Sequence, residues 1–179
     1  MKYYVVALFD EDTYQIIAPI QRNMSKKFRA NRNSPAPYIP LAIIDNPNLD
    51  KLNPILNKII SPYKSFRIDA NDLVYLSEPT KTVNLKLDNK GYIKRLSRSI
   101  CDTLSLHGFN IKTLGENFIS LANLGYIPKD YKKQDVKLNV PDIYCDSNIV
   151  KLRIKSIEIW KLPTVKKNTP VQSYPLKSF

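Results

Sequence analysis

The sequence contains few glycines and few metal-binding side chains, and these shortages exclude several common kinds of site. Four glycines stand against thirteen prolines, and neither G-x-G-x-x-G nor G-x-x-x-x-G-K-[ST] occurs. Glycine-rich loops for dinucleotides or nucleoside triphosphates therefore have no support. The two cysteines, Cys101 and Cys145, are far apart, and His107 is the only histidine. We therefore expect reduced thiols, no metal site and no bound cofactor.

The chain also has no long apolar run. The apolar segment at residues 2–9 is followed at once by Asp10, Glu11 and Asp12, which an export signal would not carry at that place. No stretch approaches the roughly 20 apolar residues that cross a bilayer. These features predict a soluble, cytoplasmic protein without a membrane partner.

Acidic residues are scarce relative to basic ones. Lysine and arginine number 28 against 16 acids, which gives a formal net charge of +12. Such an excess favours RNA or a nucleotide as partner, because neutralising phosphates releases condensed counterions. The alternative is that a composition rich in lysine, asparagine and isoleucine reflects a biased genome. The candidate phosphate-binding or RNA-binding residues are Lys26, Lys27, Arg29, Arg32, Lys132, Lys133, Arg153 and Lys155.

No break in composition marks a linker, so residues 1–179 are expected to form one domain. Within it, hydrophobic periodicity predicts a strand–helix–strand order that occurs twice. This order indicates an α+β fold with two mainly antiparallel sheets and helices packed outside them. The first helix is expected to have Asp12 or Thr13 as its N-cap, and to start late or bend because it contains Pro19. Asn84 falls on the polar side of an alternating strand, which predicts a wet face. The other strands are expected near 2–9, 37–44, 65–76, 81–87, 117–124, 136–140 and 150–160, and the other helices at 48–60 and 90–107.

Two short segments, one in each half of the chain, share one pattern. The first reads Tyr38-Ile39-Pro40-Leu41 and the second reads Phe118-Ile119-Ser120-Leu121. Pro40 cannot donate to a ladder, so the first segment is expected at a sheet edge or at an irregular strand end. The pair resembles the His-x-Thr/Ser-Leu signature of the 2H phosphoesterases, the family that includes the bacterial 2',5' RNA ligase-like proteins.

The resemblance extends over nearly the whole chain. It includes the helix end at 106–109, the late strand at 152–160 and the ending at 174–176, in the family's order and spacing. It implies a bilobal fold of two intertwined lobes, related by a pseudo-two-fold axis and facing a central cleft. In active members, one motif histidine is the general base and the other the general acid, and the hydroxyls hold phosphate oxygens.

Carrying the pattern over residue by residue leaves one chemical position intact. The histidines fall on Tyr38 and Phe118, the first hydroxyl falls on Pro40, and the second is retained as Ser120. Asn123 occupies the position where a basic residue often follows. A phenol titrates near about 10, so Tyr38 is a poor base at neutral pH. The resemblance therefore implies a degenerate motif, with no residue assigned as catalytic.

Three functions compete at this point. In the first, a non-catalytic protein binds RNA or a cyclic or linear nucleotide in a basic cleft, and the two aromatic rings stack a base. In the second, the protein is a cyclic nucleotide or RNA phosphodiesterase with altered catalytic residues. In the third, it is a protein-interaction or oligonucleotide-sequestering module. Tyr38 and Phe118 either stack a base or fill the cleft, and an enzyme is the less favoured interpretation.

Overall fold

The computed structural model describes residues 1–77, 80–89, 91–127, 136–137, 150–162 and 169–178. These residues form three helices and nine strands. The helices are α1 (Glu11–Lys27), α2 (Leu49–Ile60) and α3 (Gly91–Leu106). The strands are β1 (Lys2–Phe9), β2 (Ile39–Asp45), β3 (Phe66–Ser77), β4 (Thr82–Asn89), β5 (Asn110–Lys112), β6 (Phe118–Asn123), β7 (Val136–Lys137), β8 (Val150–Leu162) and β9 (Thr169–Pro175).

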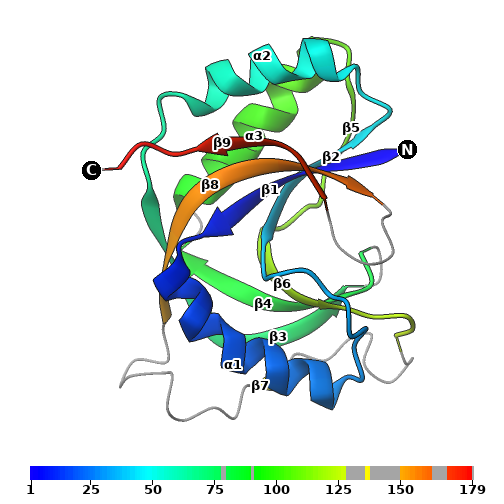
Figure 1. The fold of residues 1–179 in the computed structure, drawn as a ribbon, viewed down its shortest axis with the longest axis vertical. Helices are drawn as coiled ribbons and strands as arrows, with labels where there is room; N and C mark the ends of the chain where they lie inside the picture. The colour runs from blue at the N-terminus through cyan, green and yellow to red at the C-terminus, as the bar shows by residue number, and fades with distance from the viewer. Residues whose placement is uncertain (78–79, 90, 128–135, 138–149, 163–168, 179) are drawn as a thin grey trace.

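The strands form one curled sheet in which each described pair of strands is antiparallel (Figure 1). The strand order is β5-β2-β1-β8-β3-β4-β6, with β7 beside β3 and β9 beside β8. In Figure 1, α2 and α3 lie above the sheet and α1 lies below it. The predicted α+β fold with antiparallel strands and outer helices is confirmed. The two halves share one continuous sheet because β8 pairs with β1 and with β3.

The N-cap of helix α1 lies two or three residues earlier than predicted. It is Asp10, whose Oδ1 accepts a hydrogen bond from the Thr13 amide at 2.9 Å. The prediction of Asp12 or Thr13 as the N-cap was wrong because Asp10 satisfies a free amide of the first turn. The helix also continues beyond Pro19. Gln15, whose carbonyl would have met the missing Pro19 amide, is exposed, so water can satisfy it.

The predicted apolar stripe of α3 is confirmed. Ile93, Leu96, Ile100 and Leu104 are all buried in the core between the helices and the sheet. Gly108 follows the helix with a φ of +83°, the left-handed conformation that glycine adopts without a steric penalty. The amphipathic pattern therefore predicted which face of this helix is buried, and Gly108 marks where the helix ends.

The two sides of the sheet carry separate apolar clusters. The larger cluster joins the sheet to all three helices. A smaller cluster of Val6, Tyr38 and Trp160, with Tyr4 and Leu8 packed against it, contains no helical residue. We call the side of the sheet that carries this smaller cluster the inner face.

The helices are exchanged between the two halves. Helix α1 follows β1 but packs against β6, and α3 follows β4 but packs against β2. Each of these two helices therefore covers the strand that carries the sequence motif of the other half. Among the helices of the described ranges, none is both long and apolar enough to cross a membrane.

Candidate functional site

The two motif segments meet directly. Tyr38 precedes β2, Ser120 lies in β6, and the two residues form an antiparallel bridge. The Tyr38 amide donates to the Ser120 carbonyl at 3.3 Å, and the Ser120 amide donates to the Tyr38 carbonyl at 2.8 Å. The curled sheet thus closes on itself where the two motifs lie.

Each motif leucine occupies a register shift. The β1–β2 ladder skips Leu41 and the β4–β6 ladder skips Leu121. A skipped residue has no ladder partner, so its carbonyl needs another donor. Ser97 of α3 donates to the Leu41 carbonyl at 2.7 Å, and Gln21 of α1 donates to the Leu121 carbonyl at 2.8 Å. The predicted irregularity at Pro40 is confirmed, because Pro40 borders the first shift.

Tyr38 is buried on the inner face, with 4% of its surface exposed. Its ring lies edge-on to Trp160, with centroids 4.8 Å apart, and the Trp160 indole donates to Glu158 at 2.8 Å. Burial raises the pKa of Tyr38 to about 12. The Ser120 hydroxyl opposes part of this rise, although its Oγ does not meet the geometry of a hydrogen bond. The phenol therefore stays protonated near pH 7.

Phe118 is equally enclosed. Only 3% of its surface is exposed, and its ring lies edge-on to Tyr75 with centroids 6.0 Å apart. Neither motif ring presents a free face to solvent in this structure. Of the two alternatives, stacking on a base or filling the cleft, burial favours the second, because Tyr38 and Phe118 pack as part of the protein interior.

The retained motif hydroxyl belongs to a buried polar row. Ser120 pairs with Asn84 across the β4–β6 ladder, and the Ser120 Oγ and Asn84 Nδ2 have no hydrogen-bond partner among the described residues. Thr82 donates to the Asn84 Oδ1 at 2.7 Å. The predicted wet face was wrong at Asn84, which has no exposed surface because the sheet curls over it. Asn84 was not among the predicted site residues. The available signal was its polar side chain between apolar neighbours in the sequence.

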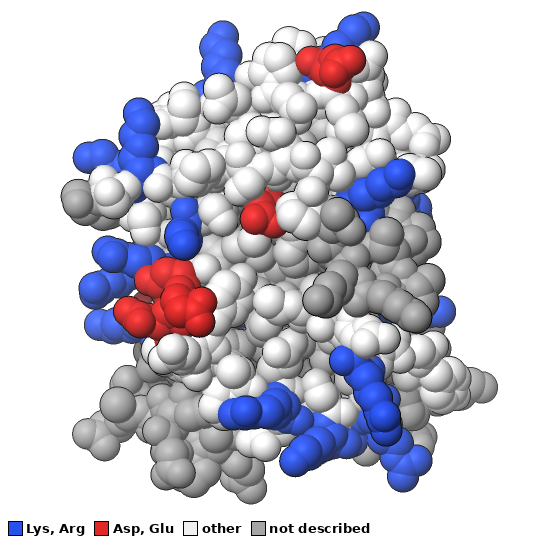
Figure 2. Space-filling view, in the orientation of Figure 1, with Lys and Arg blue, Asp and Glu red and all other residues white. Residues whose placement is uncertain are grey.

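Basic side chains gather where α1 ends. Arg22, Lys26, Arg29 and Arg32 line a pocket of about 450 Å³, which we call the basic pocket. Figure 2 shows red side chains over the start of α1 and blue ones over its end. Part of this charge offsets the helix macrodipole, which is favourable to cations at a C-terminus. Lys27, a predicted candidate, is not part of this lining, and its Nζ lies 5.8 Å from the Phe28 ring centroid.

Arg29 has a backbone conformation that its side chain disfavours. It directly follows the C-cap Phe28 and has a φ of +50°. Glycine is the usual residue there, because a Cβ in the left-handed region costs roughly 1–2 kcal/mol. The strained position places Arg29 in the lining of the basic pocket.

Hydrogen bonds connect the basic pocket to β6, the strand that carries the second motif. The Asn31 amide donates to the Asn123 carbonyl at 2.9 Å, and the Asn123 amide donates to Ser34 Oγ at 2.9 Å. Gln21 also donates to the Pro35 carbonyl at 3.0 Å. Asn123, a predicted site position, therefore connects the pocket to β6 through its main chain.

The other candidate residues lie elsewhere. Arg153 and Lys155 are on β8 and do not line the basic pocket. Arg153 is half-buried, its Nε has no hydrogen-bond partner among the described residues, and it pairs with Arg67 across the β3–β8 ladder. Lys132 and Lys133 lie outside the described residues. In the part of the chain that the structure describes, no group of His, Cys, Asp or Glu is placed to hold a metal ion.

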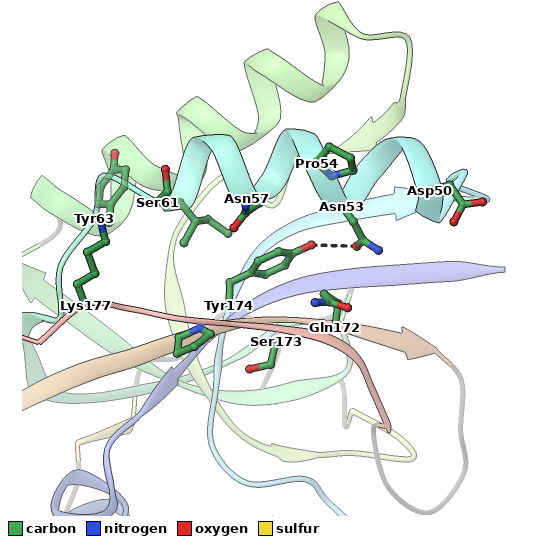
Figure 3. A pocket seen from close by; sticks show the side chains of 12 residues that line it. Asp50, Asn53, Pro54, Asn57, Ser61, Tyr63, Gln172, Ser173, Tyr174 and Lys177 are labelled. Carbon is green, nitrogen blue, oxygen red and sulfur yellow. Dashed lines mark hydrogen bonds between the residues drawn. The ribbon is translucent and has the colours of Figure 1, made fainter.

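A neutral pocket of about 700 Å³ lies between α2 and β9 (Figure 3). Its lining is rich in amides and hydroxyls, and the Tyr174 hydroxyl donates to Asn53 Oδ1 at 2.9 Å. Burial raises the pKa of Tyr174 to about 12. Asp50 and Lys177 are the charged residues in the lining. Opposite charges and neutral amides give this pocket no preference for an anion.

The arrangement is similar to that of several solved structures. TT0787 of Thermus thermophilus matches with a TM-score of 0.67 and 12% identity over 99% of both chains. E. coli LigT complexed with 3'-AMP matches with a TM-score of 0.65 and 13% identity, over 98% of this chain and 97% of LigT. A structure described as a phosphoesterase matches with a TM-score of 0.60 and 9% identity, over 98% of both chains. The chain has the 2H phosphoesterase fold.

The 2H phosphoesterase fold thus extends over nearly the entire chain, which confirms the resemblance at the level of fold. E. coli LigT complexed with NADP+ and LigT complexed with ATP match with TM-scores of 0.64 and 0.60, at 10% and 11% identity. No protein-family model and no curated protein matches the sequence.

Proposed function

We propose that this protein is a non-catalytic protein of the 2H phosphoesterase fold that binds RNA or a nucleotide. The observation that carries the proposal is the chemistry of the two motif positions. General acid–base catalysis at neutral pH needs groups that titrate near that pH. Phe118 has no proton to transfer, and burial raises the pKa of Tyr38 to about 12. The one histidine, His107, is exposed at the end of α3.

The basic pocket supports an anionic ligand. It brings four cationic side chains to one place, and none of the four has an ion-pair partner among the described residues. Like charges held together repel one another, and a bound phosphate relieves that repulsion. The nucleotides named for LigT, 3'-AMP, NADP+ and ATP, are ligands of this chemical class. The proposal requires no metal and no cofactor, and we expect the protein to act in the cytoplasm.

The test is a titration with 3'-AMP and with short single-stranded RNA at about 50 mM and about 200 mM salt. The same samples are analysed for products, with 2',3'-cyclic and 2',5'-linked substrates included. We expect salt-sensitive binding without turnover. Turnover above that of a Tyr38→Phe variant would show that catalysis persists.

Charge-reversal variants locate the binding surface. Arg32→Glu changes the basic pocket, and the double change of Lys132 and Lys133 to Glu tests the second basic group. Lys58→Glu is the matched control, because Lys58 is exposed on α2 and does not line the basic pocket. We expect Arg32→Glu to weaken RNA binding and Lys58→Glu to leave it nearly unchanged. Equal effects of both variants would show that binding depends on the net charge of the protein and not on the basic pocket.

A protein-interaction or oligonucleotide-sequestering module is the second candidate. The burial of Tyr38 and Phe118 favours it, because rings that fill the interior do not stack a base. Absence of both RNA binding and turnover in the titration would move the assignment to this function.

A further inference from the structure

We infer that a further pocket, formed by the segment that connects α2 to β3, the start of β3 and the start of α3, stacks the bases of single-stranded RNA. The inference rests on the proposed function and assigns its base-binding site. The pocket has a volume of about 590 Å³, within the usual range for ligand sites. We call it the aromatic pocket, and the lining residues that the argument uses are Tyr63, Phe66, Arg67, Tyr92 and Arg95.

Tyr92 provides an exposed ring with a fixed orientation. Its exposed fraction is 57%, whereas the motif rings are almost fully enclosed. It stacks on Phe66 with centroids 5.4 Å apart and an interplanar angle of 24°, and Phe66 belongs to the main core. The Arg95 guanidinium lies 5.9 Å from the Tyr92 ring centroid. A ring held this way loses little conformational freedom when a base stacks on it.

Arginine side chains lie beside the exposed ring. Arg67 is exposed, lines the aromatic pocket and sits directly opposite Arg153 in the antiparallel ladder. Like charges opposite one another in a sheet are destabilising. The buried Nε of Arg153 has no hydrogen-bond partner among the described residues. A phosphate group beside Arg67 offsets this repulsion.

The combination of aromatic rings and arginines matches a nucleotide better than an acidic peptide. Proteins that bind single strands use aromatic platforms for bases and basic grooves for the backbone. An acidic peptide would use Arg67 and Arg95 but has no planar base to stack on Tyr92. We therefore assign the aromatic pocket to single-stranded RNA, with a base on Tyr92 and a phosphate beside Arg67.

The experiment compares an oligoadenylate hexamer with an abasic hexamer of the same backbone. The proteins are the full chain, Tyr92→Ser, Tyr92→Phe and the control Tyr126→Ser, which changes another exposed tyrosine outside the aromatic pocket. We expect Tyr92→Ser to weaken oligoadenylate binding roughly ten-fold to a hundred-fold, the range for loss of one stacked base. Tyr92→Phe keeps the ring and is expected to bind as the full chain does, as is Tyr126→Ser. Abasic binding is expected to be the same for all four proteins.

Arg67→Ala separates the phosphate contact from stacking. We expect the slope of log affinity against log salt to fall by about 0.7, the effect of one contact on a single strand. Lys112→Ala, on the exposed side of β5, removes the same charge elsewhere and should leave the slope unchanged.

The outcomes separate this inference from the proposed function. If the full chain binds oligoadenylate and Tyr92→Ser binds it equally well, the stacking site is overturned and the proposed function stands. If the full chain binds 3'-AMP but no RNA, the aromatic pocket is overturned as an RNA site and the proposed function stands. If the full chain binds neither 3'-AMP nor RNA, the proposed function itself fails. If Tyr92→Ser loses affinity for the abasic strand and for oligoadenylate equally, stacking on Tyr92 is overturned. Tyr92-dependent binding of a polyglutamate peptide would assign the aromatic pocket to a protein partner instead.

Discussion

Tyr38 and Ser120 exchange two backbone hydrogen bonds, although one precedes β2 and the other lies in β6. The pair is the point at which the curled sheet closes on itself. The inner face beneath it holds Asn84 without exposed surface. The two motif segments therefore hold the two halves together, whatever chemistry they carry.

Gln21 is expected to contribute more to the stability of the fold than most polar side chains do. Its Nε2 donates to the carbonyls of Leu121 and Pro35. Gln21→Ala leaves both carbonyls without this donor, and we expect a loss of about 1–3 kcal/mol in the free energy of unfolding. Urea unfolding measures it, with the exposed Gln15→Ala on the same helix as control. Equal stability of the two variants would show that water replaces Gln21.

Tyr38 is expected to make the fold sensitive to alkali. The folded pKa is about 12 against an ordinary value of 10.0, so the folded state holds the proton more tightly than the unfolded state. The contribution is complete below about pH 10 and is lost as pH rises towards 12. The loss amounts to about 2–3 kcal/mol at most.

Tyr38→Phe should therefore flatten the fall in stability between about pH 10 and pH 12. The effect is partial, because burial also raises the pKa of Tyr14 and of Tyr174 to about 12. Tyr126→Phe, at an exposed ring, is the matched control. An unchanged alkaline profile in Tyr38→Phe would place the sensitivity in other residues.

Arg29 is expected to lower stability and to raise affinity. Arg29→Gly removes the left-handed strain and should raise the free energy of unfolding by about 1 kcal/mol. The same change removes one cation from the basic pocket and should weaken RNA binding. Lys81, whose φ is +51°, does not line that pocket, so Lys81→Gly should stabilise the protein without loss of affinity. Thermal unfolding and RNA titration of both variants give the comparison, and unchanged affinity in Arg29→Gly would remove Arg29 from the site.

Ser120 is expected to be dispensable for binding. Its buried Oγ has no hydrogen-bond partner among the described residues, so Ser120→Ala removes a desolvated hydroxyl at little cost. We expect stability within about 1 kcal/mol of the original and unchanged affinity for 3'-AMP. A large loss of affinity would instead identify this hydroxyl as a phosphate ligand.

Local patterns predicted most of the elements, because α3 and β1 carry their own periodicity. The short strand β5 and the polar strand β9 were missed or only partly foreseen. Their strand geometry comes from pairing with β2 and β8, which adjacent sequence does not reveal.

The site was less accessible to prediction than the fold. The sequence identified Tyr38, Phe118 and Ser120 as corresponding positions and placed three cations of the basic pocket among its candidates. It did not reveal that α1 and α3 exchange partners, since the Gln21–Leu121 bond spans a hundred residues. The burial of Asn84 depends on the curl of the whole sheet. The aromatic pocket joins three elements, so neither Tyr92 nor Arg67 stood out alone.

The position of β8 also constrains the order of events during synthesis. This strand lies between β1 and β3, yet it comes from residues 150–162. The ribosome synthesises β1 long before it synthesises β8, the strand that completes the pairing of β1. The two long edges flanking the gap remain unpaired until then, a state that invites aggregation. Translation speed over the codons of β8 should therefore affect the yield of folded protein more than speed over the codons of β1.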